Sequence, residues 1–269
     1  MWALSQPWRP GRRPLLADTP ARLLVALACV AAASRLLAGR TPLAAVAMRV
    51  VGVAAGHGAL LATALAWAGC GRGSGVVAIV LLGAAAAAAT VRPAGALAYL
   101  FVPLWIAWLA RRRRLAALGL AGPVSRRALL AAVALGAVLG GHLLVSASLT
   151  LGVHIRPDGV AAVLAALAYD AGANVLAAEC FFRGALFNRA QRRWSRAGGL
   201  ALATAAYVAR YLVDPLLPKS VEWLVGATFY LTLLGAGNCW LFWWSGSLVP
   251  GLVGALIFFT GYRLLGTGP

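Results

Sequence analysis

Acidic residues are scarce in this sequence. The 269 residues include 6 Asp and Glu against 24 Lys and Arg, which gives a formal net charge of +18. Charged residues make up 11% of the chain, whereas a soluble domain carries roughly 25%. Because 62% of the residues are hydrophobic and the mean hydropathy is +0.85, the composition excludes a water-soluble globular protein.

Residues that bind metals or form disulfides are also few. There are three histidines, none of them after His154, and four cysteines without CxxC spacing: Cys29, Cys70, Cys180 and Cys239. We therefore expect no disulfide framework, no metal site and no cofactor. The chain has no Walker loop, Rossmann fingerprint or nucleic-acid-binding module. Its arginines gather in short segments between apolar runs, which favours membrane lipids over nucleic acid as partners.

Long apolar runs dominate what remains. About 20 apolar residues cross the hydrocarbon core of a membrane, so the chain has room for eight or nine spans. The run at 75–91 is mostly alanine over Gly83 to Ala89 and is the weakest of these predictions. The sequence predicts an all-α, polytopic transmembrane helical bundle, with spans near 21–39, 43–69, 75–91, 94–110, 128–151, 159–187, 198–213, 223–244 and 247–266.

The distribution of arginine predicts the orientation, because short basic loops resist translocation. Arginine clusters precede the first span and follow the second, fourth and sixth spans, so all of them fall on one side if the N-terminus is cytoplasmic. We expect a basic cytoplasmic segment (1–20), N-terminal transmembrane helices (21–151) and a C-terminal transmembrane core (152–269). The abundance of alanine and arginine is typical of a GC-rich bacterial genome and indicates the inner membrane of a bacterium.

Four ionisable residues inside the predicted spans are candidates for function, since a charge at mid-membrane costs at least ~2.5 kcal/mol. Glu179 and Arg183 are four residues apart and can pair on one helical face. Asp170, nine residues before Glu179, should lie on the opposite face, which excludes a carboxylate dyad. Arg210 should pair with Glu179 or Asp170. A network that only fixes helix packing and a reactive site both remain open.

Three sequence blocks resemble one family of membrane proteases. The first is Glu179-Cys180-Phe181-Phe182-Arg183-Gly184, the second runs from Tyr207 to Leu212, and the third is Gly246-Ser247-Leu248-Val249-Pro250-Gly251. Their order and spacing are similar to those of the CPBP family (CAAX protease and bacteriocin-processing, or Abi), which are intramembrane glutamic endopeptidases. The resemblance covers about 160–260 and implies a helical membrane protein that processes membrane-associated or prenylated protein tails.

The sequence departs from the family pattern at the residues expected to activate water. Ala178 replaces the first glutamate of a pair, and Tyr211 replaces the histidine of the second motif. Ala255 and Phe259 fall where the family has its last histidine and an asparagine or aspartate. Alanine and phenylalanine cannot accept a proton from water or stabilise an oxyanion. The catalytic candidates that remain are Glu179, Arg183 and Tyr211.

Three functions therefore stay open. A protease-like protein without catalysis would bind a hydrophobic C-terminal tail or transmembrane helix of another protein, in a cavity lined by residues such as Phe181, Tyr207, Trp240 and Phe258. An active, divergent protease would use Glu179 in a cavity open to the cytoplasmic side. A small transporter would use Asp170 and Arg210 as coupling charges, although no inverted repeat is evident. His57 and His142, each alone on an apolar helix, are expected to have packing roles.

Overall fold

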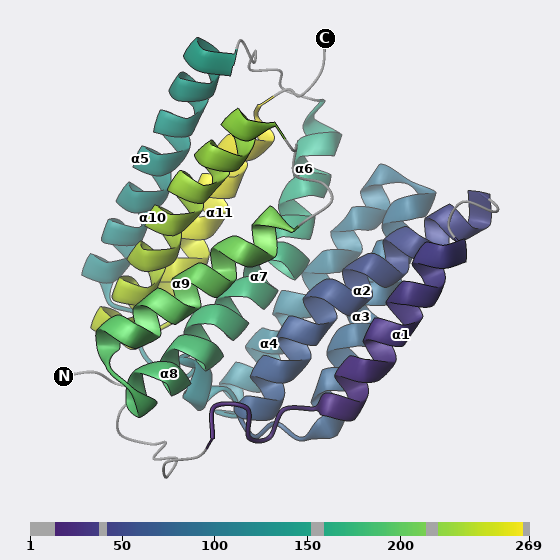
Figure 1. The fold of residues 1–269 in the computed structure, drawn as a ribbon, viewed down its shortest axis with the longest axis horizontal. Coiled ribbons are helices and arrows are strands. Elements are labelled where there is room, and N and C mark those ends of the chain that lie inside the picture. Colours follow the sequence, from purple (N-terminus) through teal and green to yellow (C-terminus); the bar gives the residue numbers. More distant parts are fainter. Residues whose placement is uncertain (1–13, 38–41, 152–158, 214–219, 266–269) are drawn as a thin grey trace.

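The computed structural model describes residues 14–37, 42–151, 159–213 and 220–265. Within these ranges the chain is all helical apart from short connections, as predicted (Figure 1). The α-helices are α1 (Ala21–Leu37), α2 (Pro42–Trp67), α3 (Arg72–Val91), α4 (Phe101–Arg111), α5 (Arg126–Leu151), α6 (Val160–Tyr169), α7 (Val175–Ala178), α8 (Asn188–Arg193), α9 (Arg196–Leu212), α10 (Val221–Ser245) and α11 (Val249–Arg263).

Four elements that are not α-helical connect these helices. Two are 3-10 turns, η2 (Pro93–Leu100) and η3 (Ala116–Leu118). Two are π-helical segments, η4 (Asp170–Asn174) and η5 (Glu179–Phe187), and they join α6, α7 and α8 into one continuous helix of 34 residues. At 1.5 Å per residue this helix is about 51 Å long, so it exceeds the apolar core of a membrane of ~30 Å.

Every predicted span corresponds to a helix, although the helices differ in length. In the described part of the chain, six helices are long and apolar enough to cross a membrane, and the alanine-rich one at Gly73–Val91 is among them. The helices α1, α9 and α11 have 15 to 17 residues. Figure 1 shows α1 to α3 grouped on one side of the molecule and α5, α10 and α11 on the other, with the long α6–α8 helix between them.

Glycine allows α5 and α11 to pack closely. A Cβ atom at Gly136 would overlap the carbonyl oxygen of Gly254, and one at Gly261 would lie 3.1 Å from the Cα of Gly140. Gly136 and Gly140 are therefore helix-packing contacts, since small residues let two backbones approach in a membrane.

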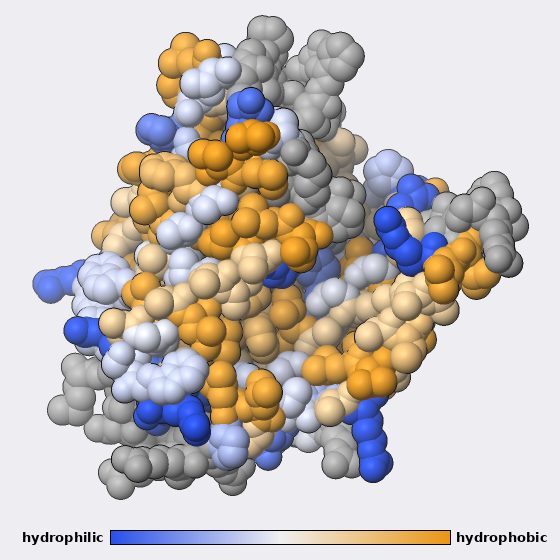
Figure 2. Space-filling view, viewed as in Figure 1, coloured by the Kyte–Doolittle hydropathy of each residue, from blue (hydrophilic) through white to orange (hydrophobic). Residues whose placement is uncertain are grey.

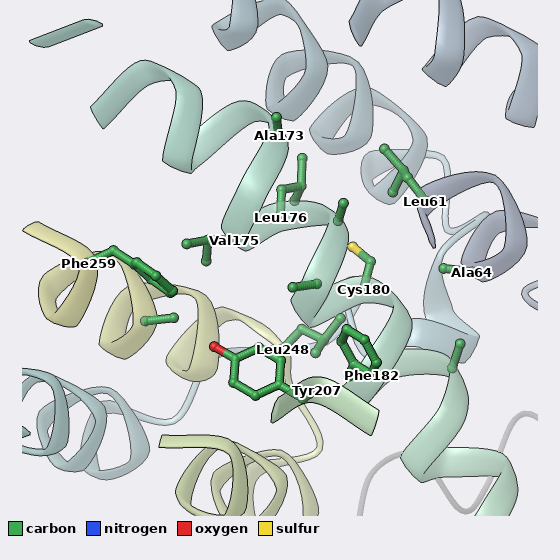
Figure 3. Close-up of a cluster of buried hydrophobic side chains, with 14 of the residues drawn as sticks. Leu61, Ala64, Ala173, Val175, Leu176, Cys180, Phe182, Tyr207, Leu248 and Phe259 are labelled. Atoms are coloured by element: carbon green, nitrogen blue, oxygen red, sulfur yellow. The ribbon is translucent and has the colours of Figure 1, made fainter. Parts of the chain in front are cut away.

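The apolar core surrounds the middle of the α6–α8 helix. Figure 3 shows Leu176 and Cys180 of this helix close to Leu61 of α2 on one side, with Tyr207 of α9 and Phe259 of α11 on the other. These side chains are almost completely buried. The helix that carries the first motif is thus enclosed by its neighbours on several sides, which fixes its polar side chains in place.

The chain before α1 is attached to the end of the bundle where the arginine-rich loops lie. Arg189 forms an ion pair with Asp18 at 3.5 Å and donates a hydrogen bond to the carbonyl oxygen of Leu15 at 3.2 Å. Its guanidinium lies 4.1 Å from the centre of the Trp67 ring. Trp67 in turn donates a hydrogen bond to Thr19 at 3.1 Å. These contacts hold the N-terminal segment across the ends of α2 and α8.

Candidate functional site

Glu179 and Arg183 form the ion pair that their spacing predicts. Nη1 of Arg183 lies 3.2 Å from Oε1 of Glu179, and each side chain is 1% exposed. Asn238 of α10 donates one amide hydrogen to Oε1 of Glu179 at 3.0 Å and the other to the carbonyl oxygen of Gly251 at 3.1 Å. The guanidinium of Arg183 also lies 3.9 Å from the centre of the Tyr207 ring. The pair is therefore enclosed and held from three neighbouring helices.

Two glycines make room for this ion pair. A Cβ atom at Gly251, the last residue of the third sequence block, would lie 3.0 Å from Oε2 of Glu179. A Cβ atom at Gly235 of α10 would lie 3.4 Å from Nη2 of Arg183. Asn238 and Gly235 were not singled out from the sequence. The signal available in the sequence was the position of Asn238, a polar residue three positions after Gly235 in an otherwise apolar span.

The residues at the substituted motif positions pack together and are buried. Ala178 and Ala255 are each 1% exposed. The ring of Tyr211 stacks on the ring of Phe259, with centroids 5.5 Å apart. The hydroxyl of Tyr211 donates a hydrogen bond to Oδ1 of Asn174 at 2.9 Å. No carboxylate or imidazole stands at these positions to take a proton from water.

Tyr211 is linked to the Glu179–Arg183 pair through the ring of Tyr207. The rings of Tyr207 and Tyr211 meet edge to face, with centroids 4.9 Å apart, and the ring of Tyr207 lies under the guanidinium of Arg183. The three catalytic candidates therefore lie in one region, but Tyr211 makes its hydrogen bond to Asn174, one turn before Ala178.

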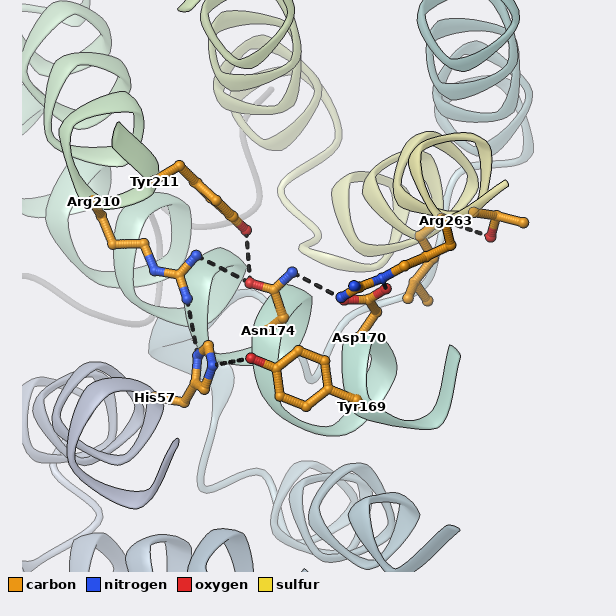
Figure 4. Close-up of polar contacts among 9 residues, drawn as sticks. His57, Tyr169, Asp170, Asn174, Arg210, Tyr211 and Arg263 are labelled. Carbon is orange, nitrogen blue, oxygen red and sulfur yellow. Dashed lines mark hydrogen bonds and ion pairs between the residues drawn. The ribbon is translucent and has the colours of Figure 1, made fainter. Parts of the chain in front are cut away.

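A second polar cluster lies around Asn174, and Arg210 belongs to it (Figure 4). Arg210 donates hydrogen bonds to Oδ1 of Asn174 and to Nδ1 of His57, each at 3.1 Å. It forms no ion pair with either acid within the described residues, so the prediction that it pairs with Glu179 or Asp170 is wrong. Asn174 lies between Arg210 and Asp170, and donates its amide to Oδ1 of Asp170 at 3.0 Å.

Asp170 pairs instead with an arginine near the C-terminus. Nε and Nη2 of Arg263 each donate to the carboxylate of Asp170 at 2.9 Å. Asp170 is completely buried, whereas Arg263 is 31% exposed. This bidentate pair was not predicted, because Arg263 lies at the end of the last predicted span, where a basic residue is ordinary.

Asp170 and Glu179 do not form a dyad, but the predicted reason is wrong. Both carboxylates face α11, because Asp170 contacts Arg263 and Glu179 lies against Gly251. The π-helical turn η4 contains more residues per turn than an α-helix, so it changes the angle between the two positions. Nine residues separate the acids by about 13 Å along the helix axis, and this distance keeps them apart.

Both helical histidines join helices by hydrogen bonds. Nε2 of His57 in α2 lies 2.7 Å from the hydroxyl of Tyr169 in α6. Nδ1 of His142 in α5 lies 2.6 Å from the hydroxyl of Tyr230 in α10. Both histidines therefore contribute to helix packing through specific hydrogen bonds. In the described ranges, no three His, Cys, Asp or Glu side chains are grouped closely enough to hold a metal ion.

A cavity of about 380 Å³ lies between α5, α6, α10 and α11, near the end of the bundle opposite the arginine-rich loops. Its walls include Leu143, Ala147, Leu231 and Phe258, and it reaches Asn174, Tyr211 and Phe259. Of the four residues predicted to line a binding cavity, only Phe258 does so. Phe181, Tyr207 and Trp240 do not, because the cavity lies toward the other end of α10 and α11.

Glu179 lines neither this cavity nor a second one. The second, of about 970 Å³, lies at the arginine-rich end between α1, α2 and α3 and is lined by Asp18, Arg22 and Trp67 among others. An active protease would need Glu179 in a cavity open to the cytoplasmic side, and neither of these two cavities provides it. The carboxylate of Glu179 is instead covered by Arg183, Asn238 and the backbone at Gly251.

Comparison with known proteins supports the resemblance found in the sequence. Residues 160–257 match the family model described as type II CAAX prenyl endopeptidase Rce1-like. No curated protein and no solved structure matches the chain. The matched region begins at α6 and ends within α11, so it contains the ion pair and Asp170, Asn174 and Arg210 of the polar cluster, whereas His57 and Arg263 lie outside it. Residues 160–257 of this membrane protein are therefore similar to the Rce1-like family of the CPBP group, and the match covers the C-terminal part of the chain from α6 into α11.

Proposed function

We propose that this protein is a non-catalytic member of its family, which binds a single apolar chain in the membrane without cleaving it. One observation carries the proposal: the cavity ends on Asn174, Tyr211 and Phe259, while the only glutamate of the first motif is sealed away from it by its ion pair with Arg183. At that end of the cavity a ligand would meet a phenol, an amide and a phenyl ring, none of which activates water at neutral pH. The carboxylate in the lining, Glu222, lies in the first turn of α10 and belongs to none of the three sequence blocks.

The size of the cavity limits the ligand. Its volume of about 380 Å³ falls in the range of roughly 300–1,000 Å³ for small-ligand sites. A transmembrane helix is about 10 Å wide and 30 Å long, and does not fit such a space. The proposed ligand is therefore an extended or lipidated chain, such as the hydrophobic C-terminal tail of another protein. The CAAX prenyl endopeptidase relationship makes a prenylated tail the first candidate.

The setting of this function is the lipid bilayer. The apolar helices and the family place the chain in a membrane. The richness in alanine and arginine supports a bacterial inner membrane, with the arginine-rich end of the bundle in the cytoplasm. In that orientation the cavity near Tyr211 lies in the outer half of the bilayer.

Binding and cleavage can be measured together in lipid nanodiscs. A fluorescent prenylated tail peptide is added to the wild type, to Glu179→Gln and to Gly226→Leu. Gly226 lines the cavity and has open space at its Cβ position, so leucine there fills the cavity without a clash. Gly52→Leu is the matched control, since Gly52 also has open space and lies far away on α2.

We expect saturable binding by the wild type, by Glu179→Gln and by Gly52→Leu, weaker binding by Gly226→Leu, and no cleavage by any of them. Cleavage by the wild type that disappears in Glu179→Gln would refute the proposal and establish an active glutamate protease. Binding that Gly226→Leu leaves unchanged would show that the chain is held elsewhere.

A further inference from the structure

The polar cluster around Asn174 carries an excess positive charge. Its ionisable members are Asp170, Arg263, Arg210 and His57. Asp170 and Arg263 neutralise each other through two hydrogen bonds of 2.9 Å. The charge of Arg210 is left over unless His57 or another group compensates it.

His57 cannot compensate this charge. A guanidinium only donates hydrogen bonds, so Nδ1 of His57 must accept the bond from Arg210. The ring proton therefore lies on Nε2, which faces the hydroxyl of Tyr169 at 2.7 Å, and the imidazole is neutral. The other partners of Arg210 are neutral as well: Oδ1 of Asn174 accepts a hydrogen bond, and the ring of Tyr211 lies 4.1 Å from the guanidinium carbon.

A lone guanidinium within an apolar bundle is costly, and a counter-charge relieves that cost. Among the residues that the structure describes, no carboxylate forms an ion pair with Arg210. Arg210 is only partly buried, so a group from outside the protein can reach it. Figure 2 shows a hollow between the α9 side and the α1–α2 side of the molecule, with hydrophilic atoms at its bottom.

We propose that Arg210 is the centre of an anion-binding site that takes the oxyanion of a phosphate group. The hydrogen bonds to Asn174 and His57 fix the plane of the guanidinium. A guanidinium held in one plane can donate two parallel hydrogen bonds to two oxygens of one phosphate. The phosphate can belong to the head group of an anionic lipid or to a free phosphate ion. This inference goes beyond the proposed function and does not depend on it, because Arg210 does not line the 380 Å³ cavity.

The test compares two sources of phosphate on delipidated protein. Thermal unfolding in detergent is followed with inorganic phosphate or with chloride at equal ionic strength. Lipid retention is followed by native mass spectrometry after exposure to vesicles of phosphatidylcholine alone or mixed with phosphatidylglycerol. The variants are Arg210→Gln, Arg210→Lys and the control Arg127→Gln, which removes an exposed arginine at the other end of the bundle.

We expect Arg210→Gln to weaken binding of the anion roughly tenfold or more, the fold-change for one charge-assisted hydrogen bond. Arg210→Lys should keep part of the binding, and Arg127→Gln all of it. Thermal stabilisation by inorganic phosphate, with or without retention of phosphatidylglycerol, supports a site for a free oxyanion. Retention of phosphatidylglycerol without a phosphate effect supports a lipid site.

Two outcomes would overturn the proposal. One is an anion effect that is absent from the wild type or equal in Arg210→Gln, since Arg210 would then serve only to connect α9, η4 and α2. The other concerns Asp214, which lies outside the described residues, four positions after Arg210 in the sequence. A phosphate effect that appears only in Asp214→Asn would show that the counter-charge is internal.

Discussion

The ring of Tyr211 stacks on the ring of Phe259, with centroids 5.5 Å apart and planes inclined by 26°. The sequence resemblance places these residues where the CPBP pattern has a histidine in its second motif and an asparagine or aspartate in its third, although Phe259 lies two residues beyond the matched region. Both rings line the cavity of about 380 Å³.

Replacing Tyr211 by phenylalanine should have a small effect on stability. The substitution keeps the stack on Phe259 and removes one hydrogen bond to Asn174. Oδ1 of Asn174 still accepts a hydrogen bond from Arg210, so it is not left unsatisfied. We expect a loss of about 0.5–1.5 kcal/mol in the free energy of unfolding, measured by denaturant titration in detergent. A loss above ~3 kcal/mol would mean that the hydroxyl holds the cluster together.

The free energy of unfolding should depend strongly on both partners of the Glu179–Arg183 pair. Glu179→Leu leaves a buried guanidinium without its carboxylate, and we expect a loss of about 3–5 kcal/mol. Adding Arg183→Met removes the unpaired charge, so the double variant should be more stable than Glu179→Leu alone. The same unfolding measurement tests both variants. If the double variant is the less stable of the two, Arg183 has a stabilising role apart from the pair, such as its contact with Tyr207.

Gly172 should tolerate no side chain. It lies in the π-helical turn η4, and a Cβ atom there would overlap the carbonyl oxygen of Tyr99. Gly172→Ala should therefore cost about 1–3 kcal/mol through overpacking. Gly141→Ala in α5 is the matched control, because its Cβ position is open. That control should be neutral, or more stable by up to about 1 kcal/mol, since alanine favours a helix. Equal losses in both variants would argue against the close approach of η4 to Tyr99.

Cys70 should react slowly with maleimides in the folded protein. It lies in the loop between α2 and α3, and burial raises the pKa of its thiol. Its Sγ also donates a hydrogen bond to the carbonyl oxygen of Arg114 at 3.2 Å. Since the thiolate is the reactive form, a raised pKa lowers the rate at neutral pH, and the rate should continue to rise at pH values where an exposed thiol has reached its plateau.

A protein with Cys70 as its single cysteine gives this rate directly. The same protein unfolded in sodium dodecyl sulfate provides the reference for an unperturbed thiol. Equal rates in the folded and unfolded forms would show that the loop opens readily and that Cys70 is not protected.

The sequence alone determined the class of this protein and the family that its C-terminal part resembles. Apolar runs of about 20 residues can be satisfied in lipid only as helices, because each backbone group must be hydrogen-bonded within its own segment. The pairing of Glu179 with Arg183 also followed from the sequence, since residues four apart on one helix must be neighbours. The departures from the family pattern at Ala178 and Tyr211 were also visible in the sequence, because each lies in a short motif within one helix, whose spacing is fixed.

Contacts between helices were decided only by the tertiary structure. The partners of Arg210 are His57, 153 residues away, and Asn174, and no spacing rule links positions on three separate helices. The pairing of Asp170 with Arg263 spans 93 residues in the same way. The direction in which the Asp170 side chain points could not be predicted from the sequence either. The π-helical turn at Asp170–Asn174 changes the angle between successive side chains, and the uniform composition of the helix gives no sign of such a turn. Local geometry follows from the chain itself, whereas the choice between distant polar partners depends on how the packed helices tilt and rotate.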